Sequence, residues 1–130
     1  MIVDASAILA IILQEEDGAR FSDAIAETAE PCAISPVNYL ECCVRIDRLP
    51  DKAHASRIDE ILQTMGVEIA TVTPEQAVLA RQAYQRFGKG RHPARLNLGD
   101  CFAYALARSQ GRKLLFKGDD FARTDIEAAL

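Results

Sequence analysis

The sequence predicts an α/β protein in which a parallel sheet is covered by helices on both faces. Short apolar runs, such as Met1-Ile2-Val3 and Leu114-Leu115-Phe116, alternate along the chain with longer segments of helical periodicity. Such runs suit strands that are buried on both sides, as in parallel sheets between two helical layers. The chain has 130 residues, of which 49% are hydrophobic and 26% charged, which predicts a single domain over 1–130.

The first half of the chain predicts two strands and three helices. Ser6 is expected to cap the first helix. The pair Ser35-Pro36 marks the start of the third helix, because serine is a favoured N-cap and proline fits the first helical turn. The expected elements are a strand at 1–4, helices at 6–13 and 18–28, a strand at 32–34 and a helix at 36–50.

The second half predicts three further helices and two strands. Gly66 is expected to stop the first of these helices. Thr73 begins the next, because threonine, Pro74 and Gln76 combine an N-cap, a first-turn proline and a capping box. The expected elements are a helix at 51–65, a strand at 67–72, a helix at 74–87, a loop at 88–93, a helix at 98–109 and a strand at 113–116.

Acidic residues occupy the positions at which an α/β sheet gathers functional side chains. Asp4 ends the first strand, Glu41 lies early in the helix after the second strand, and Asp100 begins the helix before the last strand. Ligands bind beyond the carboxyl ends of such strands, so we expect these side chains to converge with Asp119 or Asp120. Their repulsion requires a cation, and oxygen ligands suit Mg²⁺ or Mn²⁺. The pattern therefore predicts metal-assisted chemistry on phosphates.

Each acid also has a purely structural interpretation. Asp4 fits a cap of the following helix, Glu41 a solvated helix edge, and Asp100 an acid that complements a helix dipole. The two aspartates after Gly118 fit ordinary turn chemistry. The joint placement of these acids at one sheet edge favours the functional interpretation.

Composition argues against several other classes of protein. A net charge of −4 and a pI near 5.1 disfavour a protein that coats nucleic acid through bulk charge. The four cysteines form no CxxC pair, so buried free thiols are expected rather than a zinc site. No run approaches the ~20 apolar residues of a membrane span, and the first residues lack a basic leader segment. We therefore expect a cytoplasmic protein without a membrane partner.

Four motifs contain the acidic residues. Asp4 lies in Ile-Val-Asp-Ala-Ser, Glu41 ends Ser-Pro-Val-Asn-Tyr-Leu-Glu, and Asp100 lies in Leu-Asn-Leu-Gly-Asp-Cys-Phe-Ala-Tyr-Ala-Leu-Ala. The doublet Asp119-Asp120 lies in Leu-Leu-Phe-Lys-Gly-Asp-Asp-Phe-Ala-Arg-Thr-Asp. Together these motifs resemble a PIN domain, and more narrowly the VapC toxins of VapBC toxin–antitoxin systems, over essentially the whole chain.

This resemblance implies a PIN-like three-layer α/β/α fold with a short, mainly parallel central sheet. It also implies a Mg²⁺- or Mn²⁺-dependent endoribonuclease that forms a homodimer and is inhibited by a cognate VapB antitoxin. The expected reaction is hydrolysis of an RNA phosphodiester by metal-activated water.

The expected catalytic acids and metal ligands are Asp4, Glu41, Asp100 and either Asp119 or Asp120. Asp119 is slightly favoured as the fourth acid because it directly follows Gly118, where a tight turn is able to aim it at the pocket. Ser6 is expected to support the metal site through a hydrogen bond as well as to cap its helix.

A basic cluster spans the end of the predicted helix at 74–87 and the residues that follow it. Its members are Arg86, Lys89, Arg91, His92 and Arg95. Lys89, Arg91 and Arg95 are expected to contact RNA phosphates beside the acidic pocket without reading the base sequence. The alternative is a solvated loop.

Three rival classes fit parts of the pattern. A phosphatase of the DxDxT class is disfavoured because Asp4 is followed by Ala5-Ser6. A receiver domain would need a phosphoacceptor aspartate at the end of a third strand. A catalytically silent PIN-fold binding module would not need the complete set of acids.

Apolar residues exceed what one core-facing stripe needs in two predicted helices, 6–13 and 51–65. In the first helix these residues are Ile8, Leu9, Ile12 and Leu13. The surplus is compatible with the homodimer that the resemblance implies, and equally with ordinary core packing.

Overall fold

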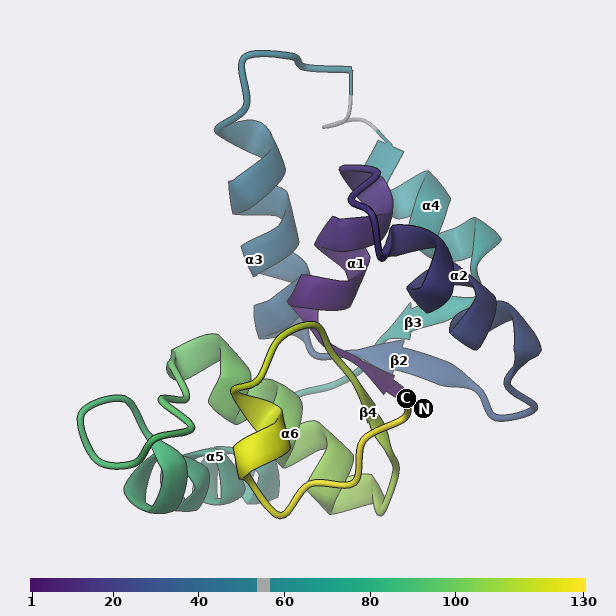
Figure 1. Cartoon of the computed structure of the whole chain (residues 1–130). Helices are drawn as coiled ribbons and strands as arrows, with labels where there is room; N and C mark the ends of the chain where they lie inside the picture. Colours follow the sequence, from purple (N-terminus) through teal and green to yellow (C-terminus); the bar gives the residue numbers. More distant parts are fainter. Residues whose placement is uncertain (54–56) are drawn as a thin grey trace.

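The computed structural model describes residues 1–53 and 57–130, and a four-stranded sheet lies at its centre (Figure 1). Every strand pairing within these residues is parallel, and Ile2 lies opposite both Ala33 and Leu114. The strands, in their spatial order, are β3 (Val67–Ile69), β2 (Cys32–Ile34), β1 (Ile2–Val3) and β4 (Leu114–Leu115). The predicted parallel sheet is confirmed.

Six helices of the described chain cover the two faces of this sheet. Figure 1 shows α1, α2, α3 and α4 on one side of the sheet and α5 and α6 on the other. This is the expected three-layer α/β/α arrangement. The helices are α1 (Ala5–Ile12), α2 (Gly18–Glu27), α3 (Pro36–Asp47), α4 (Ile58–Thr64), α5 (Pro74–Phe87) and α6 (Leu98–Gln110), followed by the short 3₁₀ helix η2 (Phe121–Arg123).

Successive residues of β1, β2 and β4 contribute to two separate cores. Val3 and Leu115 pack into the core beneath α1–α4, whereas Ile2 and Leu114 pack into the core formed with α5 and α6. All four side chains are fully buried. Because side chains alternate between the faces of a strand, a strand that is covered by helices on both faces has no position for polar residues, which explains the unbroken apolar runs of β1, β2 and β4.

Several predicted elements are shorter in the structure, among them the strands at 1–4 and 113–116 and the helix at 36–50, which ends at Asp47. The helix expected at 51–65 is α4, Ile58–Thr64, and its expected part at 54–56 lies outside the described residues. Residues 52–53 form a turn, in which the Asp51 carboxylate accepts a hydrogen bond from the Ala53 amide at 2.8 Å. An aspartate that bonds the backbone two residues on competes with helix formation, which is why the periodic pattern overestimated the helix.

The strand expected at 67–72 ends at Ile69. The last ladder bond runs from the Ala70 amide to the Ile34 carbonyl at 2.9 Å. Beyond this point β2 turns into α3 at Ser35, so the following residues lose their only neighbouring strand. The exposure of Ile69 (49%) and Val72 (37%) reflects their place at and beyond this edge of the sheet.

The residue that caps α1 is Asp4, not Ser6. Asp4 has extended backbone angles (φ −80°, ψ 157°), and its carboxylate accepts a hydrogen bond from the Ser6 amide at 2.9 Å. Ser6 lies one residue inside the helix. The prediction that Ser6 is the cap was wrong because the chain is already helical at Ala5, and the aspartate at the end of β1 reaches the free amide first.

The apolar surplus predicted in the first helix belongs mainly to the core. Ile8 and Ile12 are buried beneath the helical layer, and Leu9 and Leu13 are partly buried against them. No helix within residues 1–53 and 57–130 combines the length and apolar character needed to cross a membrane. The four cysteines are free thiols; Cys43 is half-buried and the other three are buried.

Candidate active site

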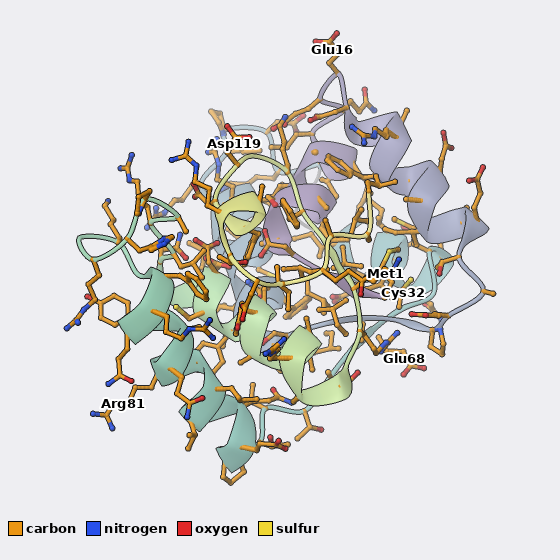
Figure 2. The ribbon with its side chains drawn as sticks, turned by 60° about the horizontal axis from the view of Figure 1, so that its bottom comes forward. Met1, Glu16, Cys32, Glu68, Arg81 and Asp119 are labelled. Atoms are coloured by element: carbon orange, nitrogen blue, oxygen red, sulfur yellow. The ribbon has the colours of Figure 1, made fainter. Side chains whose placement is uncertain are left out.

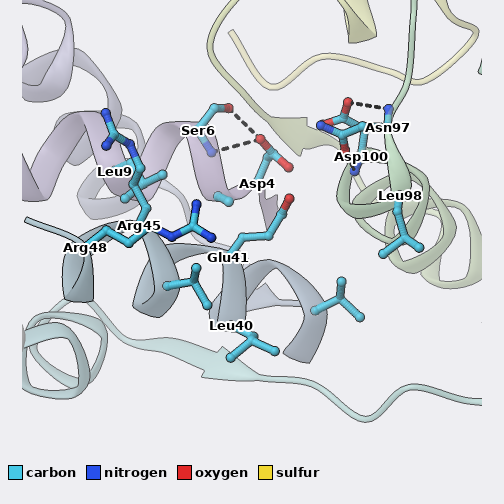
Figure 3. A pocket seen from close by; sticks show the side chains of 13 residues that line it. Asp4, Ser6, Leu9, Leu40, Glu41, Arg45, Arg48, Asn97, Leu98 and Asp100 are labelled. Carbon is cyan, nitrogen blue, oxygen red and sulfur yellow. Dashed lines mark hydrogen bonds between the residues drawn. The ribbon is translucent and has the colours of Figure 1, made fainter. Parts of the chain in front are cut away.

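Three of the predicted acids line one groove of about 550 Å³ at the carboxyl edge of the sheet. Asp4 lies at the end of β1, Glu41 on α3 and Asp100 in the first turn of α6. Figure 3 shows Asp4 and Glu41 at the middle of the groove, with Asp100 on the facing wall. The structure therefore brings together three residues that are far apart in the sequence.

Asp4 is held in place by hydrogen bonds from Ser6. Its Oδ2 atom accepts from the Ser6 amide at 2.9 Å and from the Ser6 hydroxyl at 2.5 Å. The Ser6 oxygen in turn accepts from the Lys117 amide at 3.0 Å. Lys117 also binds Asp17 at 2.8 Å and Glu15 through its ammonium group. Ser6 thus connects Asp4 to the segment that follows β4.

Glu41 is oriented by Asn38, a residue that sequence analysis missed. Asn38 is fully buried, and its Nδ2 atom donates to Glu41 Oε2 at 2.8 Å and to the Gly99 carbonyl at 3.0 Å. The same nitrogen lies 3.4 Å from Asp4 Oδ1. Within the described chain the Asn38 Oδ1 atom is buried and has no hydrogen-bond partner. The available signal was a polar residue three positions before Glu41, on the same helical face.

Gly99 leaves room for the Glu41 carboxylate. A Cβ atom built at position 99 would lie 2.1–2.3 Å from the three atoms of the Glu41 carboxyl group. Any side chain at position 99 would therefore displace Glu41 or α6. Gly99 is required here for close approach, not for an unusual backbone conformation.

Asp100 belongs to a capping box at the start of α6. Its carboxylate accepts from the Asn97 amide at 2.9 Å, and the Asn97 side chain accepts from the Asp100 amide at 2.9 Å. One carboxylate oxygen is therefore engaged by the backbone. The predicted structural role of Asp100 at a helix start coexists with its place in the groove.

Burial raises the pKa values of all three acids of the groove, and neighbouring acidic charges add to its effect. Burial raises the pKa of Asp4, which the Ser6 hydrogen bonds oppose and the charge of Asp120 reinforces. Burial and then the charge of Asp4 raise the pKa of Glu41, against the hydrogen bond from Asn38. Burial is also the main cause that raises the pKa of Asp100 to about 7, with further contributions from the charges of Asp4, Glu41 and Asp120.

Asp119 and Asp120 are both exposed on the loop after β4, where Figure 2 marks Asp119. Their electrostatic effects on the groove differ. The charge of Asp120 contributes to the raised pKa of both Asp4 and Asp100, whereas Asp119 is among the causes for neither. This difference favours Asp120 as the fourth acid, whereas the turn at Gly118 favours Asp119.

The donor set of the groove fits a hard divalent cation. Its acids repel one another, and no arginine or lysine is among the causes that shift the pKa values of Asp4, Glu41 or Asp100. Among the described residues, no three His, Cys, Asp or Glu side chains are placed so that together they could hold a metal ion. Mg²⁺ is commonly held by one or two carboxylates and keeps several water ligands, so an open arrangement suits it.

The predicted basic cluster lies outside the lining of the groove. Among described residues, the groove includes Asn97 and Leu98 but none from 86–95. The Arg91 guanidinium lies 5.3 Å from the centre of the Tyr84 ring, and the Arg86 side chain binds Asp125 at 3.0 Å. His92 accepts a hydrogen bond from the Ala94 amide at 3.1 Å, which gives it a structural role in the loop.

The fold and the acidic groove define the class of protein. The model of the PIN domain family matches residues 1–127, and the chain belongs to this family. Within the family it groups with the VapC ribonucleases. It is 44% identical over 131 residues to VapC ribonuclease Mb0625 of Mycobacterium bovis, with 100% of this chain and 98% of the relative covered.

Two further relatives are similar over nearly their whole length. Ribonuclease VapC42 of Mycobacterium tuberculosis is 45% identical, with 99% of this chain and 98% of the relative covered. Ribonuclease VapC30 of the same species is 41% identical, with 97% and 95% covered.

Solved structures confirm the fold. VapC20 of Mycobacterium tuberculosis, described as a sarcin–ricin loop cleaving toxin, superposes with a TM-score of 0.77 at 16% identity and covers 96% of this chain and 95% of its own. A chain of a toxin–antitoxin complex from Klebsiella pneumoniae gives a TM-score of 0.69 at 18% identity, with 95% and 92% covered.

Proposed function

We propose that this protein is the toxin of a type II toxin–antitoxin system and that it cleaves RNA as a divalent-metal-dependent endoribonuclease. The observation that carries the proposal is the gathering of Asp4, Glu41 and Asp100 in one groove, where no lysine or arginine contributes to the pKa shift of any of the three acids. The relatives that are named ribonucleases support RNA as the substrate.

In this mechanism Asp4, Glu41 and Asp100 would hold one or two Mg²⁺ ions, for which Mn²⁺ is a substitute. A bound divalent cation supplies charge that stabilises the phosphoryl oxygens and makes water a stronger nucleophile. Asp120 is the favoured fourth acid, with Asp119 as the alternative.

Ser6 and Asn38 fix the positions of the carboxylates. Ser6 restrains Asp4 through the 2.5 Å hydrogen bond, and Asn38 restrains Glu41 through the 2.8 Å hydrogen bond. Such supporting residues commonly change metal affinity or activity by about 10–100-fold when they are replaced. The expected product carries a 5′-phosphate.

The proposed partners are the RNA substrate, a VapB-type antitoxin and a second copy of this chain, in the cytoplasm. The similarity in fold to a chain of a toxin–antitoxin complex supports the antitoxin. Exposed apolar side chains on α5 and at the start of α6, Val78 (57%), Tyr84 (42%) and Leu98 (72%), are compatible with a contact between protein chains. Sedimentation of the purified protein, alone and with a co-expressed VapB-type antitoxin, tests both associations.

The decisive experiment compares wild type with Asp100→Asn after brief induced expression, followed by mapping of new RNA ends. We expect discrete new ends in wild-type cells only, and relief of growth arrest when the antitoxin is co-expressed. Purified protein should cleave RNA with Mg²⁺ or Mn²⁺ and lose this activity with a chelator. Hydrolysis of a phosphate monoester without RNA cleavage would instead assign a phosphatase.

A further inference from the structure

Helix α3 carries two arginines along the same groove as Glu41. Arg45 and Arg48 follow Glu41 by four and seven residues, so the three side chains share one face at successive turns. Both arginines line the groove together with Glu41. In Figure 3 they lie on the far side of Glu41 from Asn97 and Asp100. The groove therefore has an acidic centre and a basic end.

Neither arginine is neutralised by an acid within the described residues. No ion pair shorter than 4.0 Å and no side-chain hydrogen bond there involves Arg45 or Arg48. A glutamate four residues before an arginine commonly pairs with it on a helix. Here the Glu41 carboxylate binds Asn38 and lies against Gly99 instead of pairing with Arg45. The Arg45 guanidinium is therefore available to a ligand.

The groove also has an apolar wall. It is formed by Leu9, Val37, Leu40 and Val44, of which Leu40 (59%) and Val44 (40%) are strongly exposed. Guanidinium groups recognise phosphate through paired N–H donors, and an apolar surface accepts the face of a base. This combination suits a nucleotide of a single strand.

We propose that Arg45 and Arg48 bind a phosphate of the RNA next to the scissile one, and that the apolar wall of α1 and α3 receives the adjoining base. This subsite rests on the ribonuclease function proposed above. Along the helix axis, the arginines lie about 6 and 10 Å beyond Glu41, at a rise of about 1.5 Å per residue. A strand with its scissile phosphate at the acidic centre reaches them as it leaves the groove.

An acidic segment of a partner protein is the competing occupant. The RNA is favoured because the arginines and the acidic centre line one continuous groove, so a single polymer of phosphates is able to use both ends once a cation neutralises the centre. The Lys89, Arg91 and Arg95 cluster lies outside this groove and does not replace the subsite.

The test measures cleavage of a short single-stranded RNA that carries the mapped cleavage sequence, in Mg²⁺ at increasing KCl. Arg45→Gln/Arg48→Gln should raise KM more than it lowers kcat, because the arginines bind the RNA before the reaction. It should also reduce the slope of log(kcat/KM) against log[KCl] by about 0.7 for each phosphate that the variant no longer binds. Arg81→Gln, at an exposed arginine of α5 marked in Figure 2, is the matched control and should leave both unchanged.

Substrates with one uncharged methylphosphonate linkage locate the bound phosphate. At one position beside the cleavage site, the uncharged linkage should slow cleavage by the wild-type protein. The same linkage should not further slow cleavage by Arg45→Gln/Arg48→Gln. Arg45→Lys/Arg48→Lys keeps the charge without the paired donors, so it should keep the salt slope and raise KM only in part. Thermal unfolding and Mn²⁺ titration of each variant verify that the fold and the metal site are intact.

The outcomes separate the two proposals. A wild-type protein that cleaves no RNA with either metal contradicts the proposed function. Wild-type cleavage with unchanged KM and salt slope in the double variant overturns the subsite alone. Loss of antitoxin binding without any change in cleavage assigns the arginines to the antitoxin surface and also overturns the subsite.

Discussion

Replacing Gly99 by alanine should inactivate the enzyme without unfolding it. The new Cβ would lie 2.1–2.3 Å from the Glu41 carboxyl atoms, whereas ordinary contacts begin near 3.4 Å, so the carboxylate must retreat by about 1 Å. A displacement of about 1 Å in a reacting geometry costs on the order of 100-fold in rate. This corresponds to about 2.7 kcal/mol of transition-state stabilisation.

The fold should tolerate the same change. The displaced Glu41 carboxylate would lose its hydrogen bond from Asn38, and a hydrogen bond to a charged group contributes about 1.5–3 kcal/mol to stability. Alanine is favoured over glycine within a helix by about 1 kcal/mol, which offsets part of this loss. The expected net loss of unfolding free energy is therefore at most about 2 kcal/mol, measured by denaturant titration.

A double-mutant cycle with Glu41→Gln tests the cause. If Gly99→Ala acts through Glu41, it should reduce kcat/KM in the wild-type background and have little further effect beside Glu41→Gln. The reasoning is refuted if Gly99→Ala keeps the wild-type kcat/KM while Glu41→Gln is inactive. In that case Glu41 would be needed for cleavage, but not in the position that the structure shows.

Three further predictions concern the acids and their supports. Asn38→Ala removes the donor shared by Glu41 and the Gly99 carbonyl and should weaken Mn²⁺ binding by about 10–100-fold in a calorimetric titration; unchanged affinity would contradict its positioning role. The fold raises the pKa of Asp100 from 3.8 to about 7, so between these pH values Asp100 binds more protons in the folded protein than in the unfolded chain. The metal-free protein should therefore lose thermal stability as the pH rises through this range. Asp100→Asn should flatten that decline in unfolding scans with a chelator, and an equal slope in both proteins would count against it. Asp120→Asn should reduce Mn²⁺ affinity and RNA cleavage more than Asp119→Asn, and the reverse order would restore Asp119 as the fourth acid.

Local signals in the sequence were sufficient for much of the fold. The starts of α3 and α5 were predicted correctly because Ser35 and Thr73 cap their helices through neighbouring amides, with a proline in the first turn of each. The buried strands were evident from runs that are apolar on both faces. The choice between Asp4 and Ser6 as the cap of α1 could not be made in this way, because either side chain suits the position.

The supports of the site were not predictable from local signals. Asn38 looks like an ordinary polar helix residue until α6 packs beside α3 and brings the Gly99 carbonyl, 61 positions away, within 3.0 Å. Gly99 would likewise be taken for a poor helix former, whereas its role depends on the Glu41 carboxylate opposite. The choice between Asp119 and Asp120 depends on the course of a loop that neither periodicity nor capping specifies.

The order of the strands bears on when the protein becomes active during its synthesis. β4, the last strand to be translated, pairs with β1, the first, and the Lys117 amide then reaches Ser6 beside Asp4. A nascent chain that ends before residue 113 has neither this strand nor the aspartates that follow it. We therefore expect incomplete chains on the ribosome to be harmless, with nuclease activity appearing only when translation is nearly finished. Truncated chains that still cleave RNA would disprove this expectation.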